Sequence, residues 1–218
     1  MTALLEYQVM DLLDKYGIHH PDYALAGSAD EAVKALGKLS LPLVMKIVSP
    51  DILHKSDVGG VLIGLKDEND VRDGYEKIIK NVVSHKPEAR IQGVILYPMI
   101  TDGLEVIVGV TQDVTFGPVI MFGLGGIFVE LLRDVTFRAI PITMKDARQM
   151  INGIKNKVIL DGWRGSKAVD KEKLADFLCR VSDLVRKHDE ISELDLNPVR
   201  ITENGLFALD ARIILKEN

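Results

Sequence analysis

The sequence is poor in the features that mark secreted and membrane proteins. It has one cysteine, Cys179, among 218 residues, so no disulfide bond can form within the chain. No apolar run approaches the roughly 18 residues that a membrane-spanning helix requires. The first 17 residues mix acidic side chains into a helical pattern, which is not the pattern of a secretory signal peptide. We therefore expect a cytoplasmic protein with no membrane segment.

An excess of positive charge is missing as well. The chain has 27 Lys and Arg against 32 Asp and Glu, and the net charge of −5 disfavours a general nucleic-acid-binding surface. The stretch "FGLGG" at 122–126 is no P-loop, because no Gly-Lys-Ser/Thr follows it, and it leaves the Rossmann pattern G-x-G-x-x-G incomplete. The sequence predicts no nucleic-acid partner and neither of these two nucleotide sites.

Apolar residues, by contrast, are plentiful and patterned. They make up 47% of the chain, which is enough to bury a core, and 218 residues fit one large domain or two small ones. Ser28 followed by Glu31 is a capping box that begins a helix, and Thr143 and Asp170 begin two more. Early strands are predicted at "PLVMKIV", "GVLIGL", "IQGVILYPMI" and "LEVIVGVT". This mixture of helices and strands indicates an α/β or α+β fold.

The C-terminal segment predicts a hairpin that gathers oxygen-bearing side chains. Asn204-Gly205 lies between two alternating segments and is a strong turn signal. A two-residue loop there places Val199 opposite Asp210, with Asn197 as its diagonal neighbour. A four-residue loop places Asn197 directly opposite Asp210. Asp195 lies on the same face in both cases, whereas an odd-length loop would separate the three side chains.

Two interpretations of this polar face remain open. Asp195, Asn197 and Asp210 together suit a hard cation such as Mg²⁺, which takes one or two carboxylates and completes its shell with water and phosphate oxygens. A solvated face of a one-sided sheet gives the same alternation of polar residues.

Lys46 and the glycines of "FGLGG" also allow two interpretations each. Lys46 lies inside the apolar strand "LVMKIV", where a buried ammonium needs an anionic partner, either a nucleotide phosphate or a buried carboxylate. The backbone N–H groups of the glycine loop could hold phosphate oxygens, or the loop could be a tight turn that needs positive φ.

His54 lies in unusual company for a loop histidine. It is followed by "KSD" and then by Gly59-Gly60, a mixture that can handle a phosphoryl group. A neutral imidazole can act as a nucleophile toward phosphorus. A polar surface histidine is the plainer alternative, and it is how we interpret the four other histidines.

Four stretches of the chain, taken together, resemble a known family. They are "PLVMKIVSPDILHKSDVGGV", "GVILYPMITDGLEVIVGVTQDVTFGPVIMFGLGGIFVELLRDVTFRAIPI", "GWRGS" and "ELDLNPV…ALDARI". They resemble the ATP-grasp β subunit of the ADP-forming acyl-CoA synthetases (acetate–CoA ligase, ADP-forming), a family related to succinyl-CoA synthetase. The likeness covers essentially the whole chain, and the combination of "HKSDVGGV" with "DLNPV" is highly specific.

The resemblance implies an ATP-grasp fold of two subdomains with nucleotide bound between them. The smaller subdomain would be residues 21–95, and the larger would combine residues 1–20 with 96–218. The implied reaction interconverts acyl-CoA, ADP and phosphate with the free acid, CoA and ATP, with Mg²⁺ as cofactor. The implied partner is a CoA-binding α subunit in an α2β2 assembly.

The resemblance also assigns roles to individual residues. His54 would carry the phosphoryl group to ADP, and Asp195 would orient an incoming phosphohistidine. Asn197 and Asp210 would bind Mg²⁺. The implied nucleotide-binding residues are Lys46, Gly59, Gly60, Pro98, Met99, Ile100 and Glu105. Candidate anion contacts are Arg138 and Arg164.

Two other functions compete with this one. A stand-alone ATP-grasp carboxylate ligase would be active without a partner and would have no role for His54. A non-catalytic nucleotide-binding regulatory subunit would bind ADP but form no phosphohistidine. The presence of Lys46, Asn197 and Asp210 argues against the second of these.

Overall fold

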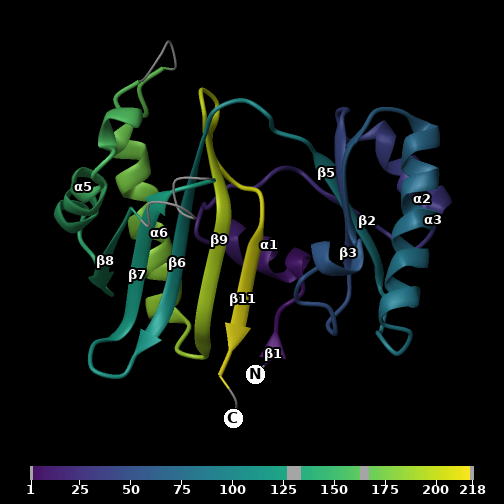
Figure 1. The fold of residues 1–218 in the computed structure, drawn as a ribbon. Helices are drawn as coiled ribbons and strands as arrows, with labels where there is room; N and C mark the ends of the chain where they lie inside the picture. The colour runs from purple at the N-terminus through teal and green to yellow at the C-terminus, as the bar shows by residue number, and fades with distance from the viewer. Residues whose placement is uncertain (1, 127–133, 163–166, 217–218) are drawn as a thin grey trace. The chain divides into compact units, whose positions relative to one another are not determined.

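The chain forms two compact units, each with its own sheet (Figure 1). The computed structural model describes residues 2–126, 134–162 and 167–216. One unit is Pro21–Thr101, and the other combines Met1–His20 with Asp102–Asn218. The limit that the resemblance implies at residue 95 falls inside strand β5 (Gly93–Pro98), which pairs with its neighbour as far as Pro98.

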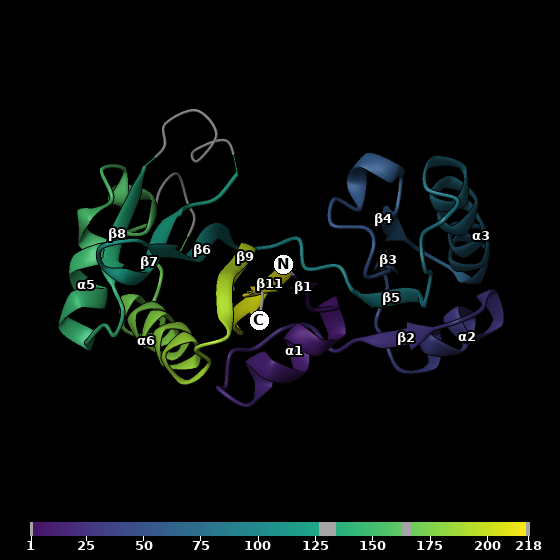
Figure 2. The same ribbon diagram turned by 90° about the horizontal axis from the view of Figure 1, so that it is seen from below.

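The Pro21–Thr101 unit is a four-stranded antiparallel sheet with helices on one face (Figures 1 and 2). The sheet order is β2-β5-β3-β4. The other strands are β2 (Ala24–Ala26), β3 (Leu43–Val48) and β4 (Val61–Leu65). The helical segments are α2 (Ala29–Lys34), η1 (Ala35–Gly37), η2 (Ser56–Val58) and α3 (Glu68–His85). Met45, Ile47 and Leu96 of the sheet pack against Ile78 and Val82 of α3 to form the core of this unit.

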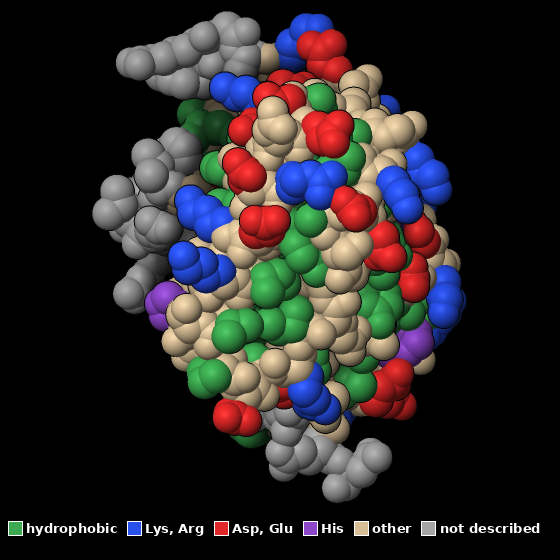
Figure 3. Space-filling model, turned by 90° about the vertical axis from the view of Figure 1, so that its right-hand side faces the viewer, with side chains coloured by type: hydrophobic (Ala, Val, Ile, Leu, Met, Phe, Trp, Pro, Cys, Tyr) green, Lys and Arg blue, Asp and Glu red, His purple; other side chains and the backbone are tan. Residues whose placement is uncertain are grey.

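Helix α3 has one apolar side that packs on the sheet and one polar side that faces solvent. Its buried residues are Val71, Gly74, Ile78 and Val82, which recur at helical spacing along one side. The opposite side is exposed, and acidic and basic side chains are interspersed over it (Figure 3). The helix therefore covers the sheet with one face and meets solvent with the other.

The second unit is built on a seven-stranded sheet. In the described part of the chain its order is β1-β11-β9-β6-β7-β8, with β10 also pairing with β9, and all these pairs are antiparallel. The strands are β1 (Thr2–Ala3), β6 (Leu104–Asp113), β7 (Gly117–Leu124), β8 (Val135–Ala139), β9 (Ile191–Thr202), β10 (Gly205–Ala208) and β11 (Ala211–Leu215). The helical segments are α1 (Glu6–Asp14), α5 (Met144–Gly153), η3 (Lys157–Ile159) and α6 (Lys171–Lys187).

Helices α1, α5 and α6 pack on the same face of this sheet, as Figure 2 shows from below. Their buried residues join one core with Val108, Phe122 and Leu196 of the strands. Side chains of alternate strand residues point to the other face, which none of the described helices of this unit covers. We call this the open face of the sheet.

The predicted helix starts are confirmed by their caps. The Ser28 hydroxyl accepts from the Glu31 N–H at 3.2 Å, and Thr143 and Asp170 cap α5 and α6 in the same way. Within the described segments, no helix combines the length and the apolar character needed to span a membrane.

Candidate functional site

The C-terminal hairpin brings Asn197 and Asp210 directly opposite each other. Its turn lies at Glu203-Asn204, because Gly205 pairs with Thr202, so the predicted Asn204-Gly205 turn is wrong by one residue. Beyond β10 the same register continues. The Asn197 N–H donates to the Asp210 carbonyl at 3.1 Å. The loop is even in length, and the arrangement is the one that we expected from a four-residue loop.

A bulge in β9 coincides with this position. Two steps along β6, from Val106 to Val108, correspond to three steps along β9, from Val199 to Leu196. One extra residue therefore lies within Asn197-Pro198. The sequence pattern did not predict this bulge.

The bulge changes which residues of β9 face the helices. Leu194 and Leu196 are buried before it, whereas Val199 and Ile201 are buried after it. Both pairs belong to the same core although their spacing is out of phase. The strand keeps a continuous apolar side, and Asn197 remains exposed at the irregularity. Bulges of this kind are frequent next to active sites, where they redirect a side chain.

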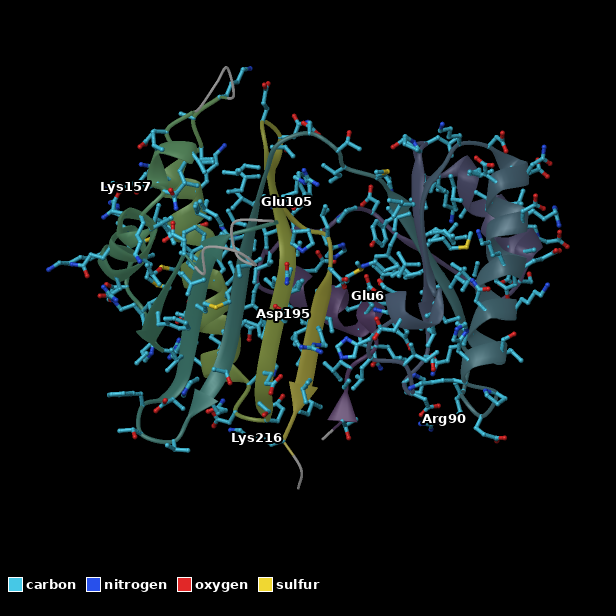
Figure 4. All side chains as sticks on the ribbon, viewed as in Figure 1. Glu6, Arg90, Glu105, Lys157, Asp195 and Lys216 are labelled. Atoms are coloured by element: carbon cyan, nitrogen blue, oxygen red, sulfur yellow. The ribbon has the colours of Figure 1, made fainter. Side chains whose placement is uncertain are left out.

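Asp195 points to the open face between two strands (Figure 4). Its cross-strand neighbours are Gly109 on β6 and Arg212 on β11. Burial raises the pKa of the Asp195 carboxyl, Arg212 lowers it, and the charges of Asp210 and Glu193 raise it further. The net shift of the pKa is upward, mainly because the carboxyl is buried, and the repulsion from Asp210 and Glu193 adds to it.

This electrostatic pattern fits a bound cation. Asp210 offers a carboxylate and Asn197 an amide oxygen, and Mg²⁺ commonly takes one or two carboxylates and keeps several waters. A positive ion here would also relieve the repulsion on Asp195. No three acidic, His or Cys side chains of the described residues converge to form a complete cage. The donor set therefore suits an ion that shares its shell with water and phosphate.

Glu105 lies on the open face farther along the sheet (Figure 4). Its carboxylate accepts from Arg200 Nη2 at 2.6 Å across β6 and β9. Its carbonyl accepts from the Gly125 N–H at 2.8 Å, and a Cβ at Gly125 would lie 2.8 Å from the Glu105 Cβ. Gly126 has φ of +62°. The close approach and the positive φ favour the turn interpretation for these glycines.

Lys46 lies in the other unit, on β3. It is 5% exposed, and its ammonium lies 5.2 Å from the centre of the Tyr97 ring. The ring face stabilises the positive charge. Lys46 pairs with Ile95 and Val61 and lies on the side of this sheet away from α3.

His54 is exposed in the loop between β3 and η2, while Ile52 and Val58 on either side are buried. The loop therefore presents the imidazole from two anchored ends. Gly60 ties its far end to β3, because the Gly60 N–H donates to the Lys55 carbonyl at 2.8 Å and the Gly60 carbonyl accepts from the Ile47 N–H at 2.8 Å.

Gly59 and Gly60 are packed closely in this arrangement. Gly59 has φ of +63° and ends η2. A Cβ at Gly60 would lie 2.6 Å from Ile47 Cγ2. Backbone geometry and close packing thus account for both glycines, and their contact with phosphate stays a prediction.

The other predicted residues are spread more widely. Pro98 ends β5, and the Met99 N–H donates to the Pro42 carbonyl at 2.8 Å, leaving Met99 and Ile100 partly exposed. Arg164 lies outside the described residues.

Arg138 is not brought together with Asp195. It pairs with Ile120, a fully buried core residue, and so lies on the helix-covered face at the exposed edge strand β8. Its charge acts on Asp146 of α5. Strand β8 is three strand spacings, about 14 Å, from β9. The sequence could not reveal this, because which face Arg138 occupies depends on its pairing with β7.

Comparison with known proteins defines the class. A family model described as an ATP-grasp domain matches residues 1–215. The mixed fold with its two units and open, polar sheet face is thereby that of an ATP-grasp protein.

Named relatives narrow the class further. The chain is 48% identical to the acetate–CoA ligase [ADP-forming] I subunit beta of Pyrococcus furiosus, over 97% of this chain and 91% of that one. It is 45% identical to the acetate–CoA ligase [ADP-forming] I of Archaeoglobus fulgidus, where 95% of this chain covers 30% of a longer one.

A solved structure gives the same answer. The acetyl-coenzyme A synthetase 1 of Ca. Korarchaeum cryptofilum, in complex with coenzyme A and Ca-AMPCP, matches with a TM-score of 0.94 and 44% identity over 99% of this chain and 94% of that one. Another structure of that protein contains coenzyme A and Mg-AMPPCP (TM-score 0.85, 40% identity, 99% and 93% coverage). Within the ATP-grasp class, our chain belongs to the family of ADP-forming acetate–CoA ligase beta subunits.

Proposed function

We propose that this chain is the nucleotide-binding subunit of an ADP-forming acyl-CoA synthetase. The enzyme would convert acyl-CoA, ADP and phosphate into the free acid, CoA and ATP. The step assigned to this chain is phosphoryl transfer from a phosphohistidine to ADP. The observation that carries the proposal is the opposition of Asn197 and Asp210 beside Asp195 on the open face.

Asn197 and Asp210 would hold Mg²⁺, which supplies positive charge to phosphate oxygens when it is bound. Phosphoryl transfer involves little covalent chemistry on the protein, so positioning and charge neutralisation account for most of the catalysis. Lys46 supplies a second positive charge for the nucleotide phosphates. The Mg-AMPPCP complex of the Korarchaeum protein supports both a nucleotide and Mg²⁺ as ligands.

His54 is proposed to carry the phosphoryl group for part of its path. In the transfer to ADP, the P–N bond of phosphohistidine breaks and a bond forms from phosphorus to a β-phosphate oxygen of ADP. Asp195 would orient the imidazole of the incoming phosphohistidine by accepting a hydrogen bond from its ring N–H. The exposed position of His54 in an anchored loop supports its role as a carrier.

The nucleotide base is proposed to lie against Pro98, Met99 and Ile100, and Glu105 is proposed as a further nucleotide-binding residue. The partly exposed end of β5 supports this placement. Gly59 and Gly60 would let backbone approach the phosphates, as the family resemblance implies.

The partner is proposed to be a CoA-binding α subunit, in an α2β2 enzyme of the cytoplasm. The P. furiosus relative is named as a subunit, whereas the A. fulgidus relative contains the matching region within a longer chain. The name of the P. furiosus relative supports the proposal that a separate subunit supplies the other functions of the enzyme.

The test is to mix the chain with its α subunit, Mg²⁺, ADP, phosphate and acetyl-CoA and to measure ATP. We expect ATP to form, and His54→Ala to abolish turnover while ADP binding stays nearly intact. The matched control is His85→Ala at the exposed end of α3, which should retain full activity.

Other outcomes would favour the competing functions. ATP-dependent ligation without a partner, unaffected by His54→Ala, would indicate a stand-alone carboxylate ligase. ADP binding with no phosphohistidine, and no effect of Asn197→Ala or Asp210→Ala, would indicate a regulatory subunit.

A further inference from the structure

Arg212 on β11 occupies the open face beside the proposed site, although the sequence pattern did not single it out. It pairs directly with Asp195 on β9. The next pair on the same face, two residues along β9 and just before β11, is Asn197 with Asp210. Cβ atoms of directly opposite residues lie about 5 Å apart, and residues two apart on one strand lie about 7 Å apart. Arg212 is thus a close neighbour of both Asp195 and Asp210.

The other side of Asp195 is bare. Gly109 is its neighbour on β6 and has no side chain. A Cβ added there would meet nothing closer than the Met121 methyl group at 3.4 Å, so packing does not demand the glycine. Asp195 therefore has the cationic side chain of Arg212 on its β11 side and no side chain next to it on its β6 side.

The guanidinium of Arg212 also has N–H donors available for a ligand. Arg200, on the same face, donates to Glu105 at 2.6 Å. In the parts of the chain that the structure describes, Arg212 forms no hydrogen bond, and its electrostatic partner is Asp195. A partly buried guanidinium with free N–H donors is suited to an anion that arrives during the reaction.

Charge explains why such a residue is needed. Asp195, Asp210 and Glu193 all act on this region with negative charge. A phosphoryl group brings about two more negative charges. A guanidinium offers a planar fork of donors that matches two phosphate oxygens, and charge-assisted bonds of this kind are about twice as strong as neutral ones.

We infer that Arg212 binds the phosphoryl group of the incoming phosphohistidine while Asp195 holds the imidazole. This inference rests on the proposed function and adds a catalytic residue to it. Arg212 donates N–H bonds to the phosphoryl oxygens and exchanges no proton, so the bond changes of the transfer are those given above.

The test uses the complete enzyme with its α subunit and compares Arg212→Gln, Arg212→Lys and Arg212→Ala. For Arg212→Gln we expect kcat to fall about 100-fold, as when one preorganised donor is removed from an active site. Arg212→Lys should retain an intermediate rate, because it keeps the charge but not the fork. KM for ADP and the Mg²⁺ concentration for half-maximal rate should stay within about twofold of the wild type, because Arg212 would act on the phosphoryl group.

Chemical rescue separates a catalytic from a structural role. Guanidinium at millimolar concentration should restore part of the rate of Arg212→Ala, whereas urea, which has the same shape and no charge, should not. The matched control is Arg186→Gln on α6, whose exposed guanidinium pairs with Asp183, and it should leave the rate unchanged.

The results distinguish this inference from the proposed function. Failure of the wild-type enzyme to make ATP would overturn the proposed function itself. An active wild type with an equally active Arg212→Gln variant would overturn the role of Arg212 alone. So would a raised Mg²⁺ requirement that saturating Mg²⁺ fully corrects, or a loss that neither lysine nor guanidinium restores.

Discussion

Asp210 is the residue whose substitution should report most directly on metal binding. Asp210→Asn removes one carboxylate opposite Asn197 while keeping the shape of the side chain. Loss of residues that merely support metal ligands costs about 10- to 100-fold in affinity, so loss of a ligand should cost at least that much. We expect a corresponding rise in the Mg²⁺ concentration for half-maximal ATP formation. Asp183→Asn, an exposed α6 residue paired with Arg186, should leave that concentration unchanged.

Gly60 allows a test of whether close packing alone requires a glycine at this position. Gly60→Ala would place a Cβ 2.6 Å from Ile47 Cγ2 and 3.0 Å from the Lys55 carbonyl oxygen. Overpacking of this kind costs about 1–3 kcal/mol. The thermal midpoint should fall, whereas Gly37→Ala, which has open space around its Cβ, should leave it nearly unchanged. An unaltered midpoint for Gly60→Ala would mean that the loop relaxes freely.

Individual residues also show what the sequence could reveal. Asn197 and Asp210 were predictable as neighbours because strand alternation fixes the face and an even loop preserves it. Arg212 was not predictable in the same way, because an arginine on an alternating strand looks like an ordinary surface cation until its pairing with Asp195 is known. The face of Arg138 depends on pairing with a distant strand, and no local pattern reports that.

At the scale of elements, the helix starts and the strands were predictable from short patterns. Caps are local, since a side chain binds an N–H group two or three residues away. The bulge at Asn197-Pro198 was not predictable from the sequence. It exists only as a mismatch between β9 and β6, whose paired residues are far apart in sequence. A mismatch of this kind can be recognised only when the pairing of the two strands is known.

The connection between α5 and η3 depends on one buried carboxylate. Asp134, 4% exposed, accepts from the Lys155 N–H at 2.9 Å and from the Asn156 N–H at 2.8 Å. Burial raises its pKa, but these bonds outweigh burial and hold the pKa below the usual 3.8. A lowered pKa in the folded state means that the stabilisation is present above pH 3.8 and is lost as the pH falls through the folded value.

Asp134→Asn should therefore destabilise the protein at pH 7 by about 3 kcal/mol, the scale of a charged buried hydrogen bond. The difference from wild type should shrink below pH 3.8. Chemical unfolding at a series of pH values measures it. Asp113→Asn is the matched control, because its carboxylate also accepts two backbone N–H groups but is exposed, and its effect should be smaller. A pH-independent loss at Asp134 would contradict the role of the charge.

For the whole molecule, two separate cores imply two regions of independent local stability. Ile78→Ala removes a fully buried side chain from the Pro21–Thr101 core, which costs about 2–5 kcal/mol. Hydrogen exchange should accelerate in β3 and β5 and stay slow in β6 and β9.

Leu178→Ala in α6 provides the reverse experiment, because Leu178 belongs to the other core. It should accelerate exchange in β6 and β9 and spare β3 and β5. Equal acceleration in both units by either variant would show that the protein unfolds as one cooperative body.

The pairing of β1 with β11, which joins Thr2 to Leu215, has a consequence for the order in which the protein is made. The Pro21–Thr101 unit has all its strands once Thr101 has left the ribosome, so it can fold while translation continues. The first strand and helix must wait for the last strand, which ends about 200 residues later, a delay of about 10–40 seconds at roughly 5–20 residues per second. During that interval α1 lacks β11, the strand against which it packs, and its apolar side is available to a chaperone that shields nascent chains.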